Sequence, residues 1–323
     1  MVKKLKNYVV SYIGLGKMGL AMVKNMLDQG HTVIAHNRSF EAINQAAKCG
    51  ALPAFNLEEL FFHAKVQGKN HKQSKKIVWL MLPAGSVTEQ KIKEILPYLK
   101  KGDVIIDGSN SNFKDAKRRA AKLKRKGINF VDVGVSGGPN GARNGACMMI
   151  GGQYSQFRYL KDLYRSICVS GGFEHFEGAG CGHYVKMVHN GIEYGIMQSI
   201  AEGFEVLKKT RYKPDLKRVA TVYQHGSIIE SKLMQMILQG LEKFGDDLKI
   251  VPGSAGSGGA SAGKLVKAEA DWTIEDAKIL KVEVPAIKSA VKERKKSKKK
   301  PSFKGKIINA MRNQFGGHSL KKK

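Results

Sequence analysis

One stretch of the chain, residues 183–198, concentrates side chains that could perform acid–base chemistry. If the stretch is a helix, its polar side chains fall at positions i, i+3, i+4 and i+7, which places them on one face. They are Lys186, His189, Asn190 and Glu193, with Tyr194 on the flank of that face. Apolar residues occupy most of the other positions, so we expect the helix to be buried. A buried helix seldom carries so many polar groups unless they are paired or used.

Two interpretations of this polar face are open at this stage. In the first, Lys186 and Glu193 belong to a buried ion-pair network that only supports the structure. In the second, they form an acid–base pair in a cleft. Burial can lower the pKa of a lysine until the amine accepts a proton, and it can raise the pKa of a glutamate until the acid donates one. The spacing alone does not decide between them, so the surrounding elements must.

The N-terminal elements include a turn that could bind a dinucleotide. A strand predicted over Tyr8–Ile13 leads into a GxGxxG turn, and a helix follows to about Gln29. The first glycine permits the turn, the second lets the backbone approach a pyrophosphate, and the third lets the helix pack closely on the sheet. The helix N-terminus adds N–H groups for the phosphates. The candidate cofactor contacts in this turn are Gly14, Leu15, Gly16, Lys17, Met18 and Gly19.

The end of the next strand, predicted over Thr32–His36, bears on the choice of cofactor. A site for NAD usually has an Asp or Glu here for the ribose 2′-hydroxyl. This chain has Asn37, Arg38 and Ser39 instead. Arg38 could pair with a 2′-phosphate through two hydrogen bonds, so the sequence favours NADP over NAD. The alternative is that Arg38 is an ordinary turn residue and that the ribose is recognised elsewhere.

Three further buried strands are predicted over Lys76–Leu82, Asp103–Asp107 and Asn129–Val133. Ligands bind at the carboxyl ends of parallel strands, so the residues that follow each strand are candidates for the site. These residues are Leu82 and Pro83 for the cofactor, Asn110 between cofactor and substrate, and the glycine-dense loop Gly134–Gly145, which contains Ser136. The loop suits capture of a carboxylate or phosphate by backbone N–H groups. Its alternative is a flexible turn.

The remaining sequence completes an α/β domain and then becomes helical. The predicted elements are a short helix over Phe55–Phe62, a surface loop over Lys65–Lys75, a strand over Cys147–Ile150, helices over Tyr154–Ile167, 183–208 and Lys213–Gly240, a flexible loop over Pro252–Gly263, and a helix from Asp271 whose Thr273 and Asp276 form a capping box. The change in composition places the domain boundary between residues 181 and 182, giving domains 1–181 and 182–323.

Composition limits the classes of function. A chain of 323 residues suggests two domains, and its net charge of +29 favours anionic partners such as a phosphorylated metabolite, a nucleic acid or an anionic membrane surface. No apolar run is long enough for a transmembrane helix. The four cysteines, Cys49, Cys147, Cys168 and Cys181, show no metal-ligand spacing, so we expect reduced thiols, a cytoplasmic location and no metal.

At this point four motifs together resemble the short form of the 6-phosphogluconate dehydrogenase family, the decarboxylating kind. They are Ile13–Gly19, Gly134–Gly138, Lys186–Tyr194 and Phe315–His318. The third is the most specific, because related β-hydroxyacid dehydrogenases share the first two and a catalytic lysine but lack the run His-Asn-Gly-Ile-Glu-Tyr. The resemblance implies an N-terminal Rossmann-type doubly wound sheet, an all-α C-terminal domain with a basic tail, and a homo-oligomer, either a dimer or a tetramer.

The resemblance also implies residue roles in oxidative decarboxylation of 6-phosphogluconate to ribulose 5-phosphate and CO₂, a reaction of the pentose phosphate pathway and of gluconate utilization. Lys186 is the general base at the 3-hydroxyl, and Glu193 is the general acid at C1. The sugar acid is held by Asn110, Ser136, Gly137, Gly138, His189 and Asn190. The phosphate is held by Tyr194, Thr273, Arg294, Arg312 and His318, of which the last two could come from a neighbouring subunit. NADP accepts the hydride.

One departure and two alternatives accompany this expectation. Asp271 stands where the long form of the family has a phosphate-binding lysine, so we expect a displaced loop or a lost contact there. The first alternative is another β-hydroxyacid dehydrogenase with a small acid substrate. The second is a nucleic-acid-binding protein with a vestigial fold. The basic tail contains only Phe303 and Phe315 as aromatic residues, which disfavours base stacking.

Overall fold

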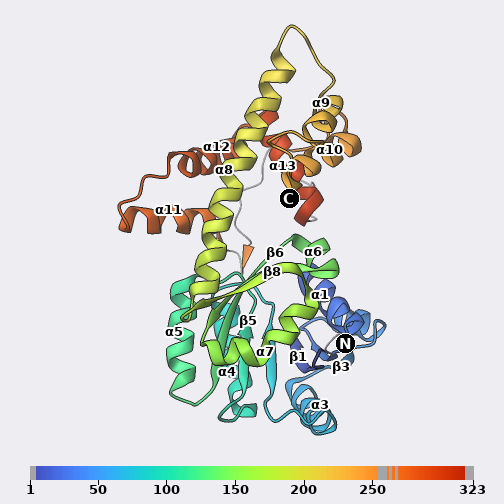
Figure 1. The fold of residues 1–323 in the computed structure, drawn as a ribbon, viewed down its shortest axis with the longest axis vertical. Helices are drawn as coiled ribbons and strands as arrows, with labels where there is room; N and C mark the ends of the chain where they lie inside the picture. The colour runs from blue at the N-terminus through green and yellow to red at the C-terminus, as the bar shows by residue number, and fades with distance from the viewer. Residues whose placement is uncertain (1–4, 253–259, 262–263, 266–267, 317–323) are drawn as a thin grey trace. The chain divides into compact units, whose positions relative to one another are not determined.

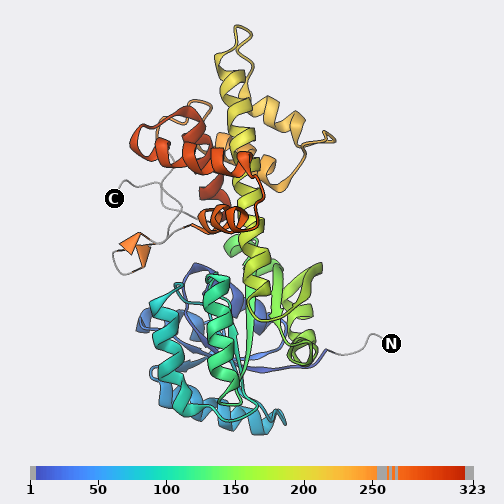
Figure 2. The ribbon, with the colours of Figure 1, turned by 90° about the vertical axis from the view of Figure 1, so that its left-hand side faces the viewer.

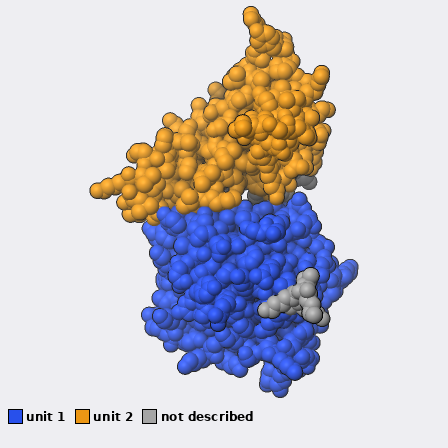
Figure 3. Space-filling view, in the orientation of Figure 1, with its two compact units in different colours: residues 1–187 blue, residues 188–323 orange. Residues whose placement is uncertain are grey.

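The computed structural model describes residues 5–252, 260–261, 264–265 and 268–316. The chain forms two compact units, Met1–Met187 and Val188–Lys323, which Figure 3 shows in different colours. The sequence had suggested a division between residues 181 and 182. The structural division falls later because the first turns of the long central helix pack against a strand of the first unit.

The first unit is built on an eight-stranded sheet with the order β3-β2-β1-β4-β5-β6-β7-β8. The strands are β1 (Val9–Ile13), β2 (Thr32–His36), β3 (Leu52–Ala54), β4 (Ile77–Leu80), β5 (Val104–Asp107), β6 (Asn129–Ser136), β7 (Ala146–Gly152) and β8 (Cys168–Glu177). The strands from β3 to β6 are parallel, whereas β7 is antiparallel to β6 and parallel to β8. The chain order reverses between β1 and β4, so the loops after these two strands border a crevice of the kind that binds ligands.

Helices cover both faces of this sheet (Figures 1 and 2). They are α1 (Lys17–Asp28), α2 (Phe40–Ala47), α3 (Leu57–Asn70), α4 (Ser86–Ile95), α5 (Phe113–Lys124), α6 (Gly138–Asn144) and α7 (Tyr154–Ile167), with a short 3₁₀ turn η1 (Leu96–Tyr98). Neighbouring residues of a strand point to opposite faces. Val10 and Tyr12 of β1 accordingly join the core under α1 and α7, whereas Val9 and Ile13 join the core under α3, α4 and α5.

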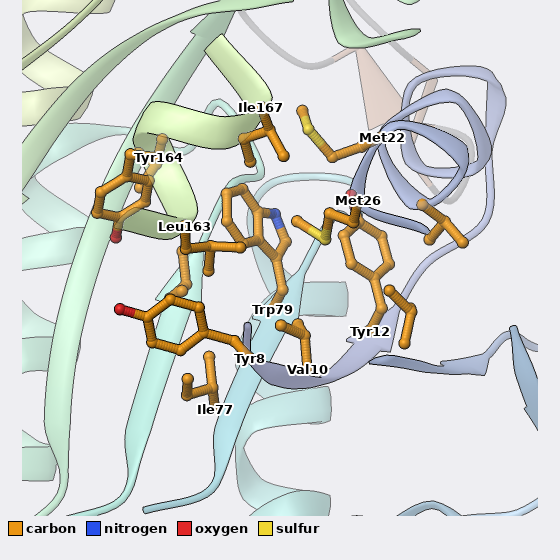
Figure 4. Packing of buried hydrophobic residues seen from close by; sticks show 14 of the residues in the cluster. Tyr8, Val10, Tyr12, Met22, Met26, Ile77, Trp79, Leu163, Tyr164 and Ile167 are labelled. Atoms are coloured by element: carbon orange, nitrogen blue, oxygen red, sulfur yellow. The ribbon is translucent and has the colours of Figure 1, made fainter. Parts of the chain in front are cut away.

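Aromatic packing fills the centre of the first of these cores (Figure 4). The Trp79 side chain is fully buried, with its ring stacked on Tyr12 at 6.0 Å between centroids and Tyr164 edge-on at 6.4 Å. Met22 and Met26 of α1 complete the cluster. Truncating a buried aromatic side chain of this kind typically costs about 3–5 kcal/mol, so this cluster is a main source of stability for the sheet.

The second unit is helical. It contains the part of α8 (Cys181–Lys209) that follows Met187, then α9 (Leu216–Tyr223), α10 (Lys232–Phe244), α11 (Glu269–Ile279), α12 (Pro285–Lys299) and α13 (Phe303–Gly316), and the two-residue strands β9 (Ala260–Ser261) and β10 (Lys264–Leu265). One apolar cluster joins α8, α9, α10 and α13, and a smaller one joins α8, α11 and α12. The predicted fold class, a Rossmann-type α/β sheet followed by helices, is therefore confirmed.

Several predicted element boundaries were wrong. The predicted surface loop over Lys65–Lys75 is largely the continuation of α3, which buries Ala64 and Gly68 and runs to Asn70. The predicted glycine-dense loop instead holds the end of β6 and helix α6. Tertiary packing explains the latter, because Ala142 is buried and its carbonyl accepts a hydrogen bond from Asn25 Nδ2 at 3.1 Å. The predicted helix over Lys213–Gly240 is two helices, α9 and α10, with caps at Asp215 and Ser231.

The capping of α11 was also wrong in detail. The helix begins at Glu269, so Thr273 lies inside it and its hydroxyl donates to the Glu269 carbonyl oxygen at 3.1 Å. Asp271, rather than Asp276, reaches back toward the start of the helix, where its Oδ2 accepts from Ala268 N at 3.2 Å. None of the helices among the described residues is long and apolar enough to cross a membrane.

Candidate active site

The glycine turn after β1 has the geometry that a bound pyrophosphate requires. Gly14 has a φ of +107°, and a Cβ there would lie 2.2 Å from the Met81 carbonyl oxygen, so only glycine fits. A Cβ on Gly19 would lie 1.9 Å from the Gly14 oxygen. By contrast, nothing lies within 4 Å of a Cβ built on Gly16, the residue before α1. The space in front of this helix N-terminus is therefore open to an anionic group.

The end of β2 lies beside this turn. Leu15 N donates to Asn37 Oδ1 at 3.2 Å, and Gly14 N donates to the His36 carbonyl oxygen at 3.0 Å. Arg38 and Ser39 follow and are exposed. The structure thus gives Asn37 a role in fixing the turn and leaves the Arg38 guanidinium at the edge of the sheet, where it can reach an anionic ligand. The residues present fit a dinucleotide whose ribose carries a phosphate.

The loops after β4 and β5 adjoin the same turn. Leu82 borders Gly14, because a Cβ on Gly14 would stand 3.0 Å from Leu82 Cδ2. The Pro83 carbonyl oxygen accepts from Thr88 Oγ1 at 2.9 Å, which fixes the start of α4. In the β5 loop, Asn110 Oδ1 is buried and makes no hydrogen bond with any described residue. A buried amide oxygen without a partner calls for a donor, and a ligand could supply it.

The segment after β6 turns sharply at two glycines. Gly137 has a φ of +105° and Gly138 a φ of +64°, and α6 begins at Gly138. Residues two apart on a strand face the same side, so Ser136 lies on the same side of β6 as Gly134. This is the side on which α8 packs, because a Cβ on Gly134 would lie 2.2 Å from Lys186 Cβ. The structure therefore brings the buried Lys186 to the strand that carries Ser136.

A carboxylate that the sequence analysis missed anchors the start of α8. Asp132 of β6 is fully buried, and its two oxygens accept from Gly180 N at 2.7 Å and from His183 N at 2.9 Å. A negative charge at a helix N-terminus is favourable, and here it also satisfies two backbone donors. Gly151 and Gly182 allow this approach, because a Cβ on Gly151 would lie 2.5 Å from Asp132 Oδ1 and a Cβ on Gly182 would lie 2.6 Å from the Asp132 main-chain oxygen. Asp132 thereby fixes the helix that carries Lys186.

A buried arginine, also missed, fixes the loops after β4 and β5. Arg119 of α5 is 1% exposed, and its Nη1 donates to Asp107 Oδ2 at 2.7 Å and to Ser111 Oγ at 2.8 Å. Its Nε donates to Glu89 Oε1 of α4 at 2.8 Å. Asp107 Oδ1 in turn accepts from Ser109 Oγ at 2.6 Å. The loop that presents Asn110 is thus held on both sides by one charged network.

In the second unit, α8 carries the rest of the predicted polar face. His189 Nδ1 lies 2.9 Å from Asn190 Oδ1 and 3.9 Å from Glu193 Oε2. Because α8 runs without a break, Lys186 and Glu193 lie on one face, two turns and about 10 Å apart along the axis. A Cβ on Gly191 would lie 2.9 Å from Thr273 Cγ2, so this glycine lets α11 approach.

Two arginines converge beside Tyr194. Arg294 is 3% exposed, and its guanidinium carbon lies 3.5 Å from the centroid of the Tyr194 ring. Burial lowers the pKa of Arg312, and the neighbouring charge of Arg294 lowers it further, while Tyr194, Glu193 and Glu269 oppose this effect. Arg294, stacked on Tyr194, and the nearby Arg312 are two cations that repel each other, and such a pair is suited to bind an anion. That Arg312 and His318 serve the site of a neighbouring subunit stays a prediction.

The departure at Asp271 has a local explanation. Its Oδ1 pairs with Lys295 Nζ at 2.7 Å, and its Oδ2 accepts from Ala268 N. The carboxylate is therefore engaged within α11 and α12.

His318 lies outside the described residues. Among the residues that the structure does describe, no group of three or more His, Cys, Asp or Glu side chains could hold a metal, and none of the four cysteines is in a disulfide.

The chain is similar to known proteins over nearly its whole length. Residues 9–171 match the family model described as the NAD binding domain of 6-phosphogluconate dehydrogenase. The Bacillus subtilis protein YqeC, which has a provisional 6-phosphogluconate dehydrogenase name, is 36% identical over 97% of this chain and 99% of its own. The NAD(+)-dependent, decarboxylating 6-phosphogluconate dehydrogenase of Haloferax volcanii is 35% identical over 96% of this chain and 98% of its own.

Solved structures are similar as well. Plasmodium falciparum 6-phosphogluconate dehydrogenase, solved without ligands, with NADP+ and with 6-phosphogluconate, has a TM-score of 0.74 and 28% identity, covering 90% of this chain and 62% of that chain. Mycobacterium tuberculosis 3-hydroxyisobutyrate dehydrogenase has a TM-score of 0.68 and 21% identity, covering 93% of this chain and 98% of that chain. At the latter identity the similarity concerns the fold alone.

Proposed function

The chain belongs to the 6-phosphogluconate dehydrogenase family, and from this premise we propose that it oxidatively decarboxylates 6-phosphogluconate to ribulose 5-phosphate and CO₂ with NADP. At the coarser level it is an NAD(P)-dependent dehydrogenase of the hydroxyacid type. The finer assignment concerns the substrate and the loss of CO₂. It rests on the residues of α8 and on the arginine pair.

The observation that carries the proposal is the pair Arg294 and Arg312 beside Tyr194. A small hydroxy acid has a single anionic group, its carboxylate, which the proposed reaction places near Lys186, so it has no second anion for this pair. A sugar acid phosphate supplies one, and guanidinium groups suit its oxygens because they donate in a fixed fork. Thr273 and His318 join them in the proposed phosphate site. Asp271 is engaged with Lys295, so its charge is offset locally.

In the proposed reaction, Lys186 and Glu193 carry out the proton transfers. The residues of the glycine turn would hold the pyrophosphate of NADP, and the cofactor's nicotinamide would accept the hydride from C3 of the substrate. Lys186 Nζ takes the proton of the 3-hydroxyl, and the resulting ammonium polarises the 3-ketone. A β-keto acid with a polarised ketone loses CO₂ readily. Glu193 then donates a proton to C1 of the enediol. Ser136, Gly137, Gly138, His189, Asn190 and Asn110 orient the sugar acid.

The proposed cofactor is NADP, with NAD as the alternative. Arg38 is exposed at the end of β2, and no carboxylate occupies the two neighbouring positions, Asn37 and Ser39. The Haloferax volcanii relative is named as NAD(+)-dependent, so the preference within this family varies, and Arg38 is the residue on which our proposal depends.

A spectrophotometric assay tests the proposal. We expect reduction of NADP on addition of 6-phosphogluconate, release of one CO₂ per turnover, and slower reduction of NAD. The control substrate is 3-hydroxyisobutyrate. Faster turnover of 3-hydroxyisobutyrate than of 6-phosphogluconate would assign the chain to another β-hydroxyacid dehydrogenase. Retention on nucleic acid at physiological salt without any dehydrogenase activity would support the vestigial-fold alternative.

We further propose a homo-oligomer, a dimer or tetramer, in the cytoplasm. Large apolar side chains of α8 in the second unit, Ile192, Ile196 and Val206, are 53%, 46% and 69% exposed. Such residues are common in subunit contacts. Sedimentation equilibrium measures the assembly directly, and a monomer at micromolar concentration would contradict this part of the proposal.

A further inference from the structure

A hollow of about 450 Å³ lies between α4 and α5 on the outer side of the first unit, away from the glycine turn. Figure 2 turns the side of the molecule that carries α5 toward the viewer. The apolar lining of the hollow comes from Ile92, Leu96 and Leu123. The volume is in the range of sites that enclose small organic ligands. No residue of the proposed substrate or cofactor sites lines it.

The rim of this hollow is cationic. It is formed by Lys93 of α4 and by Lys122, Arg125 and Lys126 at the end of α5. All four side chains are exposed, and none has an ion-pair partner in the described part of the chain. Basic residues at a helix C-terminus can simply offset the helix dipole. Lys93 likewise lies in the last turn of α4, but an offset of each helix dipole does not require the cations of two helices to meet around one apolar hollow.

The inner wall of the hollow is the charged network that holds the active-site loops. Glu89 and Arg119 line it, and they are joined by the 2.8 Å hydrogen bond described above. Arg119 also contacts Asp107 and Ser111, and its Nη2 lies 3.4 Å from the Gly85 carbonyl oxygen. A ligand that contacts Glu89 or Arg119 therefore acts on the same side chains that fix the loops after β4 and β5.

We propose that the α4–α5 hollow binds an amphipathic organic anion, with its apolar body on Ile92, Leu96 and Leu123 and its phosphate or carboxylate among the rim cations. We infer that binding is coupled to cofactor affinity through Arg119. The apolar lining argues against a simple inorganic ion, and the four rim cations argue against a neutral apolar ligand. Coupling is reciprocal, so cofactor binding alters the affinity of the hollow by the same factor.

The direct test uses a fluorescent amphipathic anion, 8-anilinonaphthalene-1-sulfonate, on the full chain with NADP at saturation, so that the dinucleotide site is filled. We expect one bound probe per chain. The rim variant Lys122→Glu with Lys126→Glu should weaken binding at least tenfold. The matched control, Lys114→Glu with Lys124→Glu, makes the same change in net charge on the exposed surface of α5 outside the hollow and should bind as the unmodified protein does. Inorganic phosphate should displace the probe only weakly.

Each outcome decides one part of the proposal. Equal binding in all three proteins, or equal weakening in both variants, would overturn the site, because probe attraction would then be unspecific. To test coupling, the NADP affinity is measured with and without the probe. If the probe lowers NADP affinity by competing at the dinucleotide site, the effect persists in the rim variant. If the probe acts through the hollow, the effect on NADP affinity disappears in the rim variant. An identical effect in both proteins would overturn the coupling. These binding readouts do not depend on which substrate the enzyme turns over.

Discussion

At the scale of single residues, Lys186 is the position on which the proposed proton transfers depend. Replacing it with Met keeps the apolar stem and removes the amine. We expect Lys186→Met to lower kcat by about 10³-fold or more, since one residue serves in two steps, and to leave NADP binding within about twofold. Steady-state rates and fluorescence titration measure the two effects. Lys209→Met, at an exposed position of the same helix, is the control. Near-normal turnover of the first variant would remove Lys186 from its role.

Arg38 carries the second prediction at this scale. Arg38→Ala should raise the KM for NADP by roughly tenfold to a hundredfold, because a charge-assisted pair with the 2′-phosphate is lost, whereas the KM for NAD should change little. The change in the ratio of kcat/KM for the two cofactors is the measurement. Arg158→Ala, another exposed arginine of the first unit, should leave that ratio unchanged. An equal loss for both cofactors would refute the assignment of Arg38 to the 2′-phosphate.

Residue types and spacing predicted some of these groups and missed others for a physical reason. The GxGxxG turn and the polar face of α8 are local patterns, so the sequence displays them directly. Asp132 and Arg119 act on partners distant in the sequence, Gly180 and Glu89 respectively, and no periodicity joins those positions. The engagement of Asp271 with Lys295 was hidden for the same reason. The available signal in the sequence was a charged residue inside a predicted buried strand or helix, because charged side chains are seldom buried without a partner.

At the scale of elements, the contact between β6 and α8 positions the catalytic lysine. Gly134→Ala would place a Cβ 2.2 Å from Lys186 Cβ, so α8 must shift. We expect a loss of about 1–3 kcal/mol in the free energy of unfolding and a fall in kcat larger than the change in NADP affinity. Gly203→Ala, in α8 with nothing within 4 Å of its Cβ, should instead stabilise by about 0.5–1 kcal/mol. Chemical denaturation measures the stability of both variants. Equal destabilisation by Gly134→Ala and Gly203→Ala would contradict a specific contact between β6 and α8.

His31 ties β1 to α7 and makes the first unit sensitive to pH. Tyr8 N donates to His31 Nδ1 at 3.1 Å, and His31 Nε2 lies 2.8 Å from Ser166 Oγ. Burial lowers the pKa of His31 from 6.5 to about 4. The unfolded chain therefore binds this proton below about pH 6.5, but the folded chain does so only near pH 4. The contribution of His31 to the free energy of unfolding is fully present above pH 6.5. It is lost as the pH falls from 6.5 to 4, by about 3 kcal/mol in total.

His31→Gln removes this titration while keeping an acceptor for Tyr8 and a donor for Ser166. In a Trp272→Phe background, where Trp79 is the remaining tryptophan, denaturant midpoints followed by tryptophan fluorescence should fall less steeply between pH 7 and pH 4 in the variant than in its parent. Parallel curves for the two proteins would show that His31 does not contribute. Other groups titrate in the same window, and the comparison cancels them.

Element types were predicted better than element ends. Strands β1, β2, β4 and β5 are short apolar runs followed by turn residues, and α8 has a clear helical period, so each has a local signature. Helix α6 lacks one, since its glycines favour a loop, and it forms because Ala142 is buried and Asn25 holds its carbonyl oxygen. The extension of α3 to Asn70 likewise follows from tertiary burial of Ala64 and Gly68, which a polar composition conceals.

At the scale of the whole molecule, the net charge of +29 predicts how salt affects catalysis. A field of this sign attracts a phosphorylated sugar acid, and added salt screens it, since the Debye length falls from about 30 Å at 0.01 M to about 10 Å at 0.1 M. We expect kcat/KM for 6-phosphogluconate to fall severalfold between 0.01 M and 0.3 M NaCl, through KM, with kcat within about twofold. Sucrose of equal osmolarity controls for solvent effects and should leave KM unchanged. A fall located in kcat would instead show that salt acts on the chemical or release steps, and the long-range field would have no part in substrate capture.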